Sequence, residues 1–201
     1  MAAVKKPVNL ADVAETKNNM KIHSTPLKDL YLVEPAVFGD SRGYFMESFR
    51  AEEFDNELFG GVFVQDNESK SSNGVIRGLH YQLPPFAQTK LVRVIVGKIL
   101  DVAVDLRKSS PTFGKHFSVE LSSDNKLQLY IPKGFAHGFS VTSKEAVVLY
   151  KCDNYYAPQS EGGILWNDPQ LAIDWKIPAN SAIVSEKDMK NPYFSDAIIF
   201  E

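Results

Sequence analysis

The chain has 201 residues, of which 44% are hydrophobic and 23% are charged, and its formal net charge is −3. These values are typical of one globular domain, and they argue against disorder over the whole chain and against a strongly basic nucleic-acid-binding protein. Cys152 is the only cysteine, which excludes an intrachain disulfide and a four-thiolate zinc site. No apolar run approaches the ~20 residues that a membrane-spanning helix needs, and Met1 to Ile22 lacks the apolar stretch of a signal peptide. We therefore expect a cytoplasmic protein that binds neither membranes nor nucleic acid.

The first part of the chain is polar and has no strong period, so we interpret residues 1–25 as an N-terminal arm before a single domain of residues 26–201. From Tyr31 onward, short apolar runs alternate with turn signals at close spacing. Gly97 interrupts the longest apolar run and predicts a bend or bulge there. Short helices are expected at 51–59 and near Ser185, where an acid three residues later completes a capping signature. Strands are predicted at 44–49, 61–65, 75–82, 91–106, 117–121, 128–131, 138–141 and 146–151.

Strands dominate and do not alternate with helices, which disfavours a parallel α/β fold. The pattern instead favours an all-β, cupin-like double-stranded jelly-roll barrel with short helices. The segment from Pro132 to His137 has the spacing Pro-x-Gly-x-x-His, which resembles the second motif of cupin barrels, where the His binds a metal. The His pair of the first cupin motif is broken here, because Gln82 follows His80 at the second position. Since two isolated imidazoles make a poor zinc or iron site, we expect no metal.

Basic residues flank several predicted strands, namely Arg42, Arg77, Lys90 and Arg93. Within a chain of net charge −3, a cationic pocket formed by them would indicate an anionic ligand such as a diphosphate. They could equally be solvated charges at strand edges, and spacing alone leaves both interpretations open.

Many blocks of the sequence follow the order of one known family. They include Phe38-Gly39-Asp40-Ser41-Arg42-Gly43-Tyr44-Phe45, Phe63-Val64-Gln65-Asp66-Asn67, Arg77-Gly78-Leu79-His80-Tyr81-Gln82, Lys90-Leu91-Val92-Arg93 and Leu165-Trp166-Asn167-Asp168. On these blocks the chain resembles the dTDP-4-dehydrorhamnose 3,5-epimerases, from about Leu30 to Asp188. The resemblance implies epimerisation at C3 and C5 of dTDP-4-dehydro-6-deoxy-D-glucose, through an enolate and without a cofactor, to give dTDP-4-dehydro-L-rhamnose. It also implies a homodimer whose N-terminal strand crosses to the partner.

The resemblance assigns a role to each matching position. His80 matches the catalytic base, Asp188 the carboxylate that pairs with it, Tyr150 the acid on the opposite side of the sugar, and Lys90 the cation near the ketone oxygen. A capping role after Ser185 would also explain Asp188, and the two roles are compatible. The positions that line the nucleotide-sugar site match Arg42, Glu47, Gln65, Asn67, Arg77, His137, Tyr156, Glu161 and Lys187.

These residue types suit the reaction that the resemblance implies. A proton beside a ketone is weakly acidic, so its removal needs a positioned base such as histidine and a group that stabilises the enolate. A tyrosine can supply a proton to the other face. Alternatives that remain open are a mono-epimerase of a related nucleotide 4-keto sugar, a metal-dependent cupin enzyme and a sugar-binding barrel without catalysis.

Overall fold

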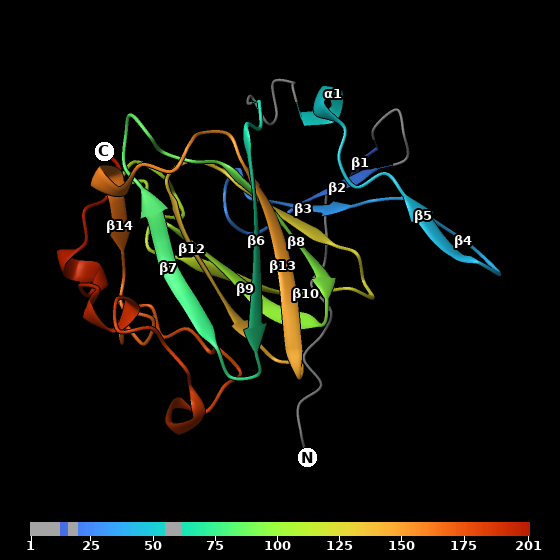
Figure 1. The fold of residues 1–201 in the computed structure, drawn as a ribbon. Coiled ribbons are helices and arrows are strands. Elements are labelled where there is room, and N and C mark those ends of the chain that lie inside the picture. The colour runs from blue at the N-terminus through green and yellow to red at the C-terminus, as the bar shows by residue number, and fades with distance from the viewer. Residues whose placement is uncertain (1–12, 16–19, 55–61) are drawn as a thin grey trace, which may run out of the picture.

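The computed structural model describes residues 13–15, 20–54 and 62–201, which form two antiparallel sheets and a separate hairpin (Figure 1). The larger sheet has the order β1 (Val13–Glu15), β2 (Lys21–Ser24), β3 (Tyr31–Glu34), β11 (Gln128–Ile131), β8 (Lys90–Val96), β13 (Glu145–Cys152), β6 (Gln65–Ser72). The smaller sheet has the order β10 (His116–Ser122), β9 (Lys98–Asp105), β12 (Phe135–Val141), β7 (Ile76–Gln82), β14 (Glu161–Gly163). The hairpin pairs β4 (Val37–Asp40) with β5 (Gly43–Met46). The expected all-β jelly-roll barrel with short helices is therefore confirmed.

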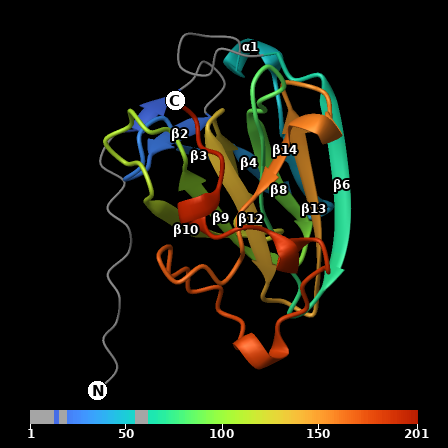
Figure 2. The same ribbon diagram turned by 90° about the vertical axis from the view of Figure 1, so that its left-hand side faces the viewer.

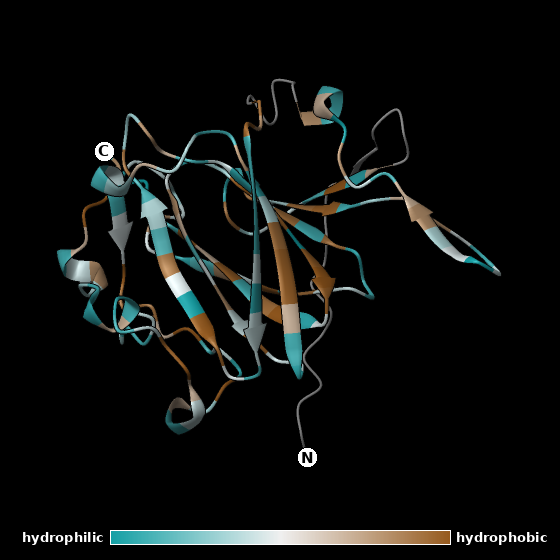
Figure 3. Cartoon of the chain, viewed as in Figure 1, coloured by the Kyte–Doolittle hydropathy of each residue, from teal (hydrophilic) through white to brown (hydrophobic). Residues whose placement is uncertain are grey.

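The main core lies between the two sheets, because alternate residues of both sheets point inward. Val92, Leu129 and Val148 of the larger sheet meet Ile99 and Leu121 of the smaller sheet, and each of these side chains is at most 1% exposed. Figure 3 shows the apolar stretches of these strands in brown. This packing holds the two sheets together and fixes the distance between the walls of the barrel.

A second core covers the outer face of the smaller sheet. The segment that follows β14, coloured orange to red in Figure 2, runs across the smaller sheet. It carries Trp175 and Phe194, which belong to one apolar cluster with Leu79 and Tyr81 of β7. It contains the 3₁₀ helices η2 (Ala179–Ser181), η3 (Asp188–Lys190) and η4 (Phe194–Asp196), and η1 (Pro158–Ser160) precedes β14. Because this segment lies against β7, residues far apart in sequence can meet there.

Gly97 is the corner at which the chain crosses from one sheet to the other. It separates β8 from β9, and its φ of +77° lies in the left-handed region that favours glycine. A Cβ at this position would lie 1.9 Å from the carbonyl oxygen of Glu145. The apolar run 91–106 is therefore two strands of different sheets, and the bend predicted at Gly97 is confirmed.

Several predicted elements differ from the structure. Of the strand predicted at 61–65, residue 61 lies outside the described residues, and the observed strand β6 runs from Gln65 to Ser72. It is a polar edge strand whose alternate residues are exposed, so it lacks the apolar run on which the prediction relied. The strand predicted at 44–49 ends at Met46, within the hairpin. Of the helix expected at 51–59, Ala51–Phe54 forms α1, and 55–59 lies outside the described residues. The helix expected near Ser185 is the short η3.

Part of the segment interpreted as an arm pairs with the barrel. Strand β2 aligns with β3, so that Ile22 lies opposite Val33, and Met20, Ile22 and His23 are buried. Among the residues that the structure describes, no helix has the length and apolar character needed to cross a membrane.

Candidate active site

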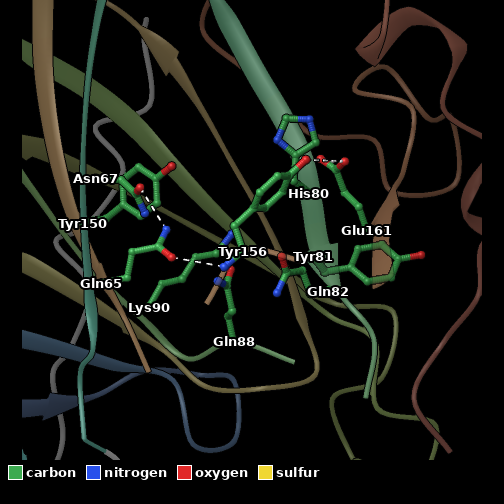
Figure 4. Close-up of a pocket in the computed structure, with 10 residues that line it drawn as sticks. All are labelled: Gln65, Asn67, His80, Tyr81, Gln82, Gln88, Lys90, Tyr150, Tyr156 and Glu161. Carbon is green, nitrogen blue, oxygen red and sulfur yellow. Dashed lines mark hydrogen bonds between the residues drawn. The ribbon is translucent and has the colours of Figure 1, made fainter. Parts of the chain in front are cut away.

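A cavity of about 380 Å³, here called the central cavity, lies between the two sheets (Figure 4). The larger sheet contributes side chains from β6, β8 and β13, and the smaller sheet contributes side chains from β7 and β14. The residues that line it are Gln65, Asn67, His80, Tyr81, Gln82, Gln88, Lys90, Tyr150, Tyr156 and Glu161. The structure thus brings together three of the predicted catalytic residues and several of the predicted binding residues.

His80 forms a hydrogen-bonded pair with Asp188, which lies on the segment that covers the smaller sheet. The His80 Nε2 atom is 2.7 Å from Asp188 Oδ1, and the backbone N–H of Gly78 donates to Oδ2 at 3.2 Å. The side chain of His80 is 35% exposed, whereas that of Asp188 is 5% exposed. The carboxylate therefore lies behind the imidazole and fixes its orientation, while the ring stays accessible from the cavity.

The surroundings of Asp188 keep it ionised. Burial alone would raise the pKa of this carboxyl, but the hydrogen bond and charge of His80 and the Gly78 N–H outweigh it and lower the pKa. Ser185 Oγ accepts the backbone N–H of Asp188 at 3.1 Å, which is the serine half of the capping signature. Among the described residues, the Asp188 carboxylate itself bonds to His80 and to the Gly78 N–H, so the structure shows the pair with His80 and no capping bond from this side chain.

Lys90 stands at the start of β8 and lines the cavity. Desolvation lowers the pKa of its ammonium group, and the negative charges of Asp101 and Glu161 oppose that effect. Within the described residues, no ion pair or side-chain hydrogen bond joins Lys90 to another group. Its N–H donors are therefore available to an oxygen atom of a ligand, where a desolvated cation interacts strongly.

Tyr150 lies on β13, opposite Asn67 of β6 and Val92 of β8. Its side chain and that of His80 come from different sheets and lie on opposite sides of the cavity (Figure 4). Burial raises the pKa of the Tyr150 phenol, so the hydroxyl keeps its proton at neutral pH. An imidazole and a protonated phenol thus face each other across one space.

His137 lies on the same face of the smaller sheet as His80, but it does not border the central cavity directly. It stands beside His80, its register partner on the neighbouring strand, and its Nε2 atom is 2.7 Å from Asp101 Oδ1. Asp101 is fully buried, and its Oδ2 atom has no hydrogen-bond partner among the described residues. Sequence reasoning missed Asp101 as part of the site, although a carboxylate within an apolar strand run was the available signal.

The remaining predicted binding residues lie at the rim or away from the cavity. Lys187 Nζ pairs with Glu161 Oε2 at 2.6 Å. Arg77 is exposed, and its Nε atom donates to Ser71 Oγ at 3.0 Å. Arg42 and Glu47 do not belong to this cavity: Arg42 lies on the hairpin that projects from the barrel and pairs with Asp40, and Glu47 follows it and pairs with Arg50 (Figure 1).

Gln82 and Gln88 also line the cavity, and the sequence did not single them out as binding residues. The Gln82 amide donates to the carbonyls of Phe86 and Tyr155 and accepts the N–H of Ala157. Gln82, which stands where a second cupin histidine would be, therefore fixes the two loops that carry Phe86 and Tyr155. Across residues 20–54 and 62–201, no three His, Cys, Asp or Glu side chains are arranged to bind a metal ion.

Asp188→Asn tests the ionised pair through the stability of the folded protein. A pKa below the ordinary value of 3.8 means that Asp188 stabilises the fold above pH ~4 and loses this effect as the pH falls through its folded pKa. The variant should be less stable than the parent at pH 7 by about 1–3 kcal/mol. This difference should shrink below pH ~4 in denaturant unfolding, because protonation then removes the same charge from the parent. Asp124→Asn, at an exposed turn, is the control. A difference that stays constant from pH 7 to pH 3 would contradict the assignment.

Comparisons with known proteins place this geometry in a family. The profile described as dTDP-4-dehydrorhamnose 3,5-epimerase matches residues 24–196. A relative of that name from Shigella flexneri is 53% identical over 182 residues, which cover 90% of this chain and 99% of the relative. The crystal structure of the Elizabethkingia anophelis dTDP-4-dehydrorhamnose 3,5-epimerase has 56% identity and a TM-score of 0.84, and the match covers 88% of this chain and 97% of that one.

The corresponding epimerase of Legionella pneumophila, solved in complex with dTDP-4-keto-L-rhamnose, has 49% identity and a TM-score of 0.83. This match covers 88% of the chain and 94% of the Legionella structure. The chain therefore belongs to the dTDP-4-dehydrorhamnose 3,5-epimerase family, whose members are nucleotide-sugar isomerases.

Proposed function

We propose that the central cavity epimerises dTDP-4-dehydro-6-deoxy-D-glucose at C3 and C5, with His80 as the base and Tyr150 as the opposing acid. The single observation that carries this proposal is the arrangement of His80–Asp188, Lys90 and Tyr150 around one space. The Legionella relative supports the choice of ligand, because it was solved with the 4-keto-L-rhamnose product class bound.

Each proton transfer in the proposed mechanism has a group on the cavity wall. His80 takes the proton from the carbon beside the ketone, and the imidazolium that forms is stabilised by ionised Asp188. The electron pair of the broken C–H bond moves onto the ketone oxygen, where the Lys90 ammonium stabilises the enolate. Tyr150 then donates its proton to the opposite face of the same carbon, which inverts it. No electrons are gained or lost overall, so the step needs no redox cofactor.

The rim of the cavity offers groups for the nucleotide and the diphosphate. Tyr156 is 55% exposed, and its O–H donates to Glu161 at 3.2 Å, which leaves a ring face free to stack on a base. Gln65 Oε1 accepts the N–H of Tyr156 at 3.1 Å and so fixes the position of that residue. Arg77 and Lys187 are exposed cations that an anionic diphosphate can approach.

Two alternatives have weaker support. A metal-dependent cupin would need a cluster of ligands, and Gln82 is already bonded to the loops at the mouth. A mono-epimerase also needs a proton donor opposite its base, so Tyr150 does not separate the two; the 53% identity to a 3,5-epimerase, against 31–32% to a 3'-monoepimerase from Streptomyces bikiniensis, supports inversion at both carbons. We also propose a cytoplasmic location, because the buried Cys152 thiol suits a reducing compartment.

We also propose that the chain forms a homodimer. In this dimer, Arg42 of the second copy would supply a cation to the central cavity, which Arg42 of the same chain does not line. Arg42 lies on a hairpin that projects from the barrel and exposes Phe38, Tyr44 and Phe45, which are 58–68% exposed (Figure 1). Monomeric proteins rarely expose so many large apolar side chains together. In a symmetric dimer, the hairpin of one copy would cover these side chains against the other and bring Arg42 toward the other copy's cavity.

Tyr150→Phe tests the two-face mechanism. The variant keeps the ring and its packing but lacks the proton donor, while His80 and Lys90 remain. Solvent deuterium should therefore still enter the sugar, and inversion should fall behind exchange at one carbon or at both. Mass spectrometry and stereochemical analysis in deuterium oxide measure both rates. Tyr155→Phe, whose side chain is 65% exposed and does not line the cavity, is the matched control. If Tyr150→Phe inverts both carbons as fast as it exchanges them, another group supplies the proton.

Mixing two inactive variants tests the partner's contribution. Arg42→Ala and His80→Asn should each have little activity, and refolding them together should form mixed dimers. If Arg42 acts in the partner's cavity, half of the dimers gain one intact site, so about a quarter of the parental activity returns. If Arg42 serves its own chain, the mixture stays inactive. Sedimentation at equilibrium checks that all three samples are dimers, and a monomeric parent would contradict the proposal.

A further inference from the structure

An irregular link between β13 and η1, residues 153–157, carries Tyr156 at the rim of the central cavity (Figure 4). Backbone groups outside regular structure still need hydrogen-bond partners, and side chains often supply them. Three glutamines that line the central cavity do so here. Gln88 Nε2 donates to the carbonyl of Asn154 at 2.8 Å, and Gln65 Oε1 accepts the N–H of Tyr156 at 3.1 Å.

Gln82, the third glutamine, holds the residues on both sides of Tyr156. Its Nε2 atom donates to the carbonyl of Tyr155 at 3.2 Å, and its Oε1 atom accepts the N–H of Ala157 at 2.8 Å. Nε2 also donates to the carbonyl of Phe86 at 2.6 Å, so both donors of the amide are used. Gln82 is 5% exposed, and all three of these bonds are to backbone atoms. The buried amide therefore fixes the path of the chain at Tyr156.

The hydroxyl end of Tyr156 is held by the strand next to Gln82. In the pairing of β14 with β7, Glu161 lies opposite Gln82, and Tyr156 O–H donates to Glu161 Oε2 at 3.2 Å. Tyr156 is nonetheless 55% exposed, because these bonds involve its backbone and its hydroxyl and leave the ring accessible. An aromatic ring that is already ordered binds a ligand without the entropy cost of ordering its side chain.

We infer that Gln82 is a positioning residue for nucleotide binding, which fixes the backbone at Tyr156 and so holds the ring ready to contact the nucleotide. This inference rests on the proposed nucleotide-sugar ligand and on the proposed contact of Tyr156 with it. A contact to the nucleotide is remote from C3 and C5 of the sugar, so it stabilises the bound substrate and the transition state alike. Loss of Gln82 should therefore raise KM and leave kcat nearly unchanged.

A double-mutant cycle of Gln82→Met and Tyr156→Ala tests the inference. Methionine keeps the length of the side chain and removes its hydrogen bonds. Each single variant should bind dTDP about tenfold more weakly than the parent in isothermal titration calorimetry. The double variant should bind no more weakly than Tyr156→Ala, because Gln82 then has no ring left to position. Steady-state kinetics of Gln82→Met should show the rise in KM without a matching fall in kcat.

Ser140→Ala is the matched control for the loss of a buried hydrogen bond. Ser140 is 0% exposed, its Oγ atom donates to the carbonyl of Trp175 at 2.6 Å, and it does not line the central cavity. This variant should unfold at a lower temperature than the parent and bind dTDP with parental affinity.

Parental dTDP affinity in folded Gln82→Met would overturn the inference. A further tenfold loss when Gln82→Met is added to Tyr156→Ala would do the same, because Gln82 would then act on the ligand by another path. If Gln82→Met does not fold, Gln82→Glu takes its place in the cycle, since an ionised carboxylate keeps the shape but cannot donate to the carbonyl of Tyr155. Failure of the proposed function is distinct, because Tyr156→Ala would then bind dTDP as tightly as the parent.

Discussion

The contact between His80 and Asp188 is the interaction on which the rest of the site depends. It joins β7, in the wall of the barrel, to a 3₁₀ helix 108 residues later in the chain. The backbone N–H of Gly78 donates to the other oxygen of the Asp188 carboxylate. The apolar packing of Trp175 and Phe194 on the smaller sheet holds that helix in place. A carboxylate buried in this way would be destabilising without its partners. The packing that buries Asp188 therefore depends on the same hydrogen bonds that orient His80.

Burial and nearby charges also set the protonation of the residues on the opposite wall of the central cavity, which belongs to the larger sheet. Lys90 is desolvated, which lowers its pKa, and the nearby carboxylates of Asp101 and Glu161 keep that effect in check. Tyr150 is also held by burial in its protonated form. The barrel thus holds the imidazole of His80, the ammonium group of Lys90 and the phenol of Tyr150 on separate strands of its two sheets, where we propose that they act as base, oxyanion partner and acid. Their positions are set before any ligand arrives, which is the arrangement that favours charge development in a transition state.

The sequence predicted those parts of the fold that depend on local pattern. The strands around His80 and at 128–131 have clear apolar runs, and Gly97 marks the sheet corner because a Cβ there would clash with the Glu145 carbonyl oxygen. The polar strand β6 could not be found this way, because one of its faces is exposed and the other lines a polar cavity. The meeting of His80 with Asp188 is a tertiary contact, and it was expected only through resemblance to the family. The distance between the Arg42 hairpin and the central cavity depends on tertiary packing that no local sequence pattern records.

The most direct test of the account follows hydrogen isotopes at C3 and C5 of dTDP-4-keto-6-deoxy-D-glucose in deuterium oxide. The parent protein should give a product with deuterium at both carbons, because each proton removed by His80 is replaced from solvent. His80→Asn should bind dTDP as the parent does and keep the fold, yet neither exchange nor invert either carbon, since Asn cannot accept the proton. Exchange by His80→Asn at more than about a tenth of the parental rate would contradict the account, because a missing general base lowers the rate by far more.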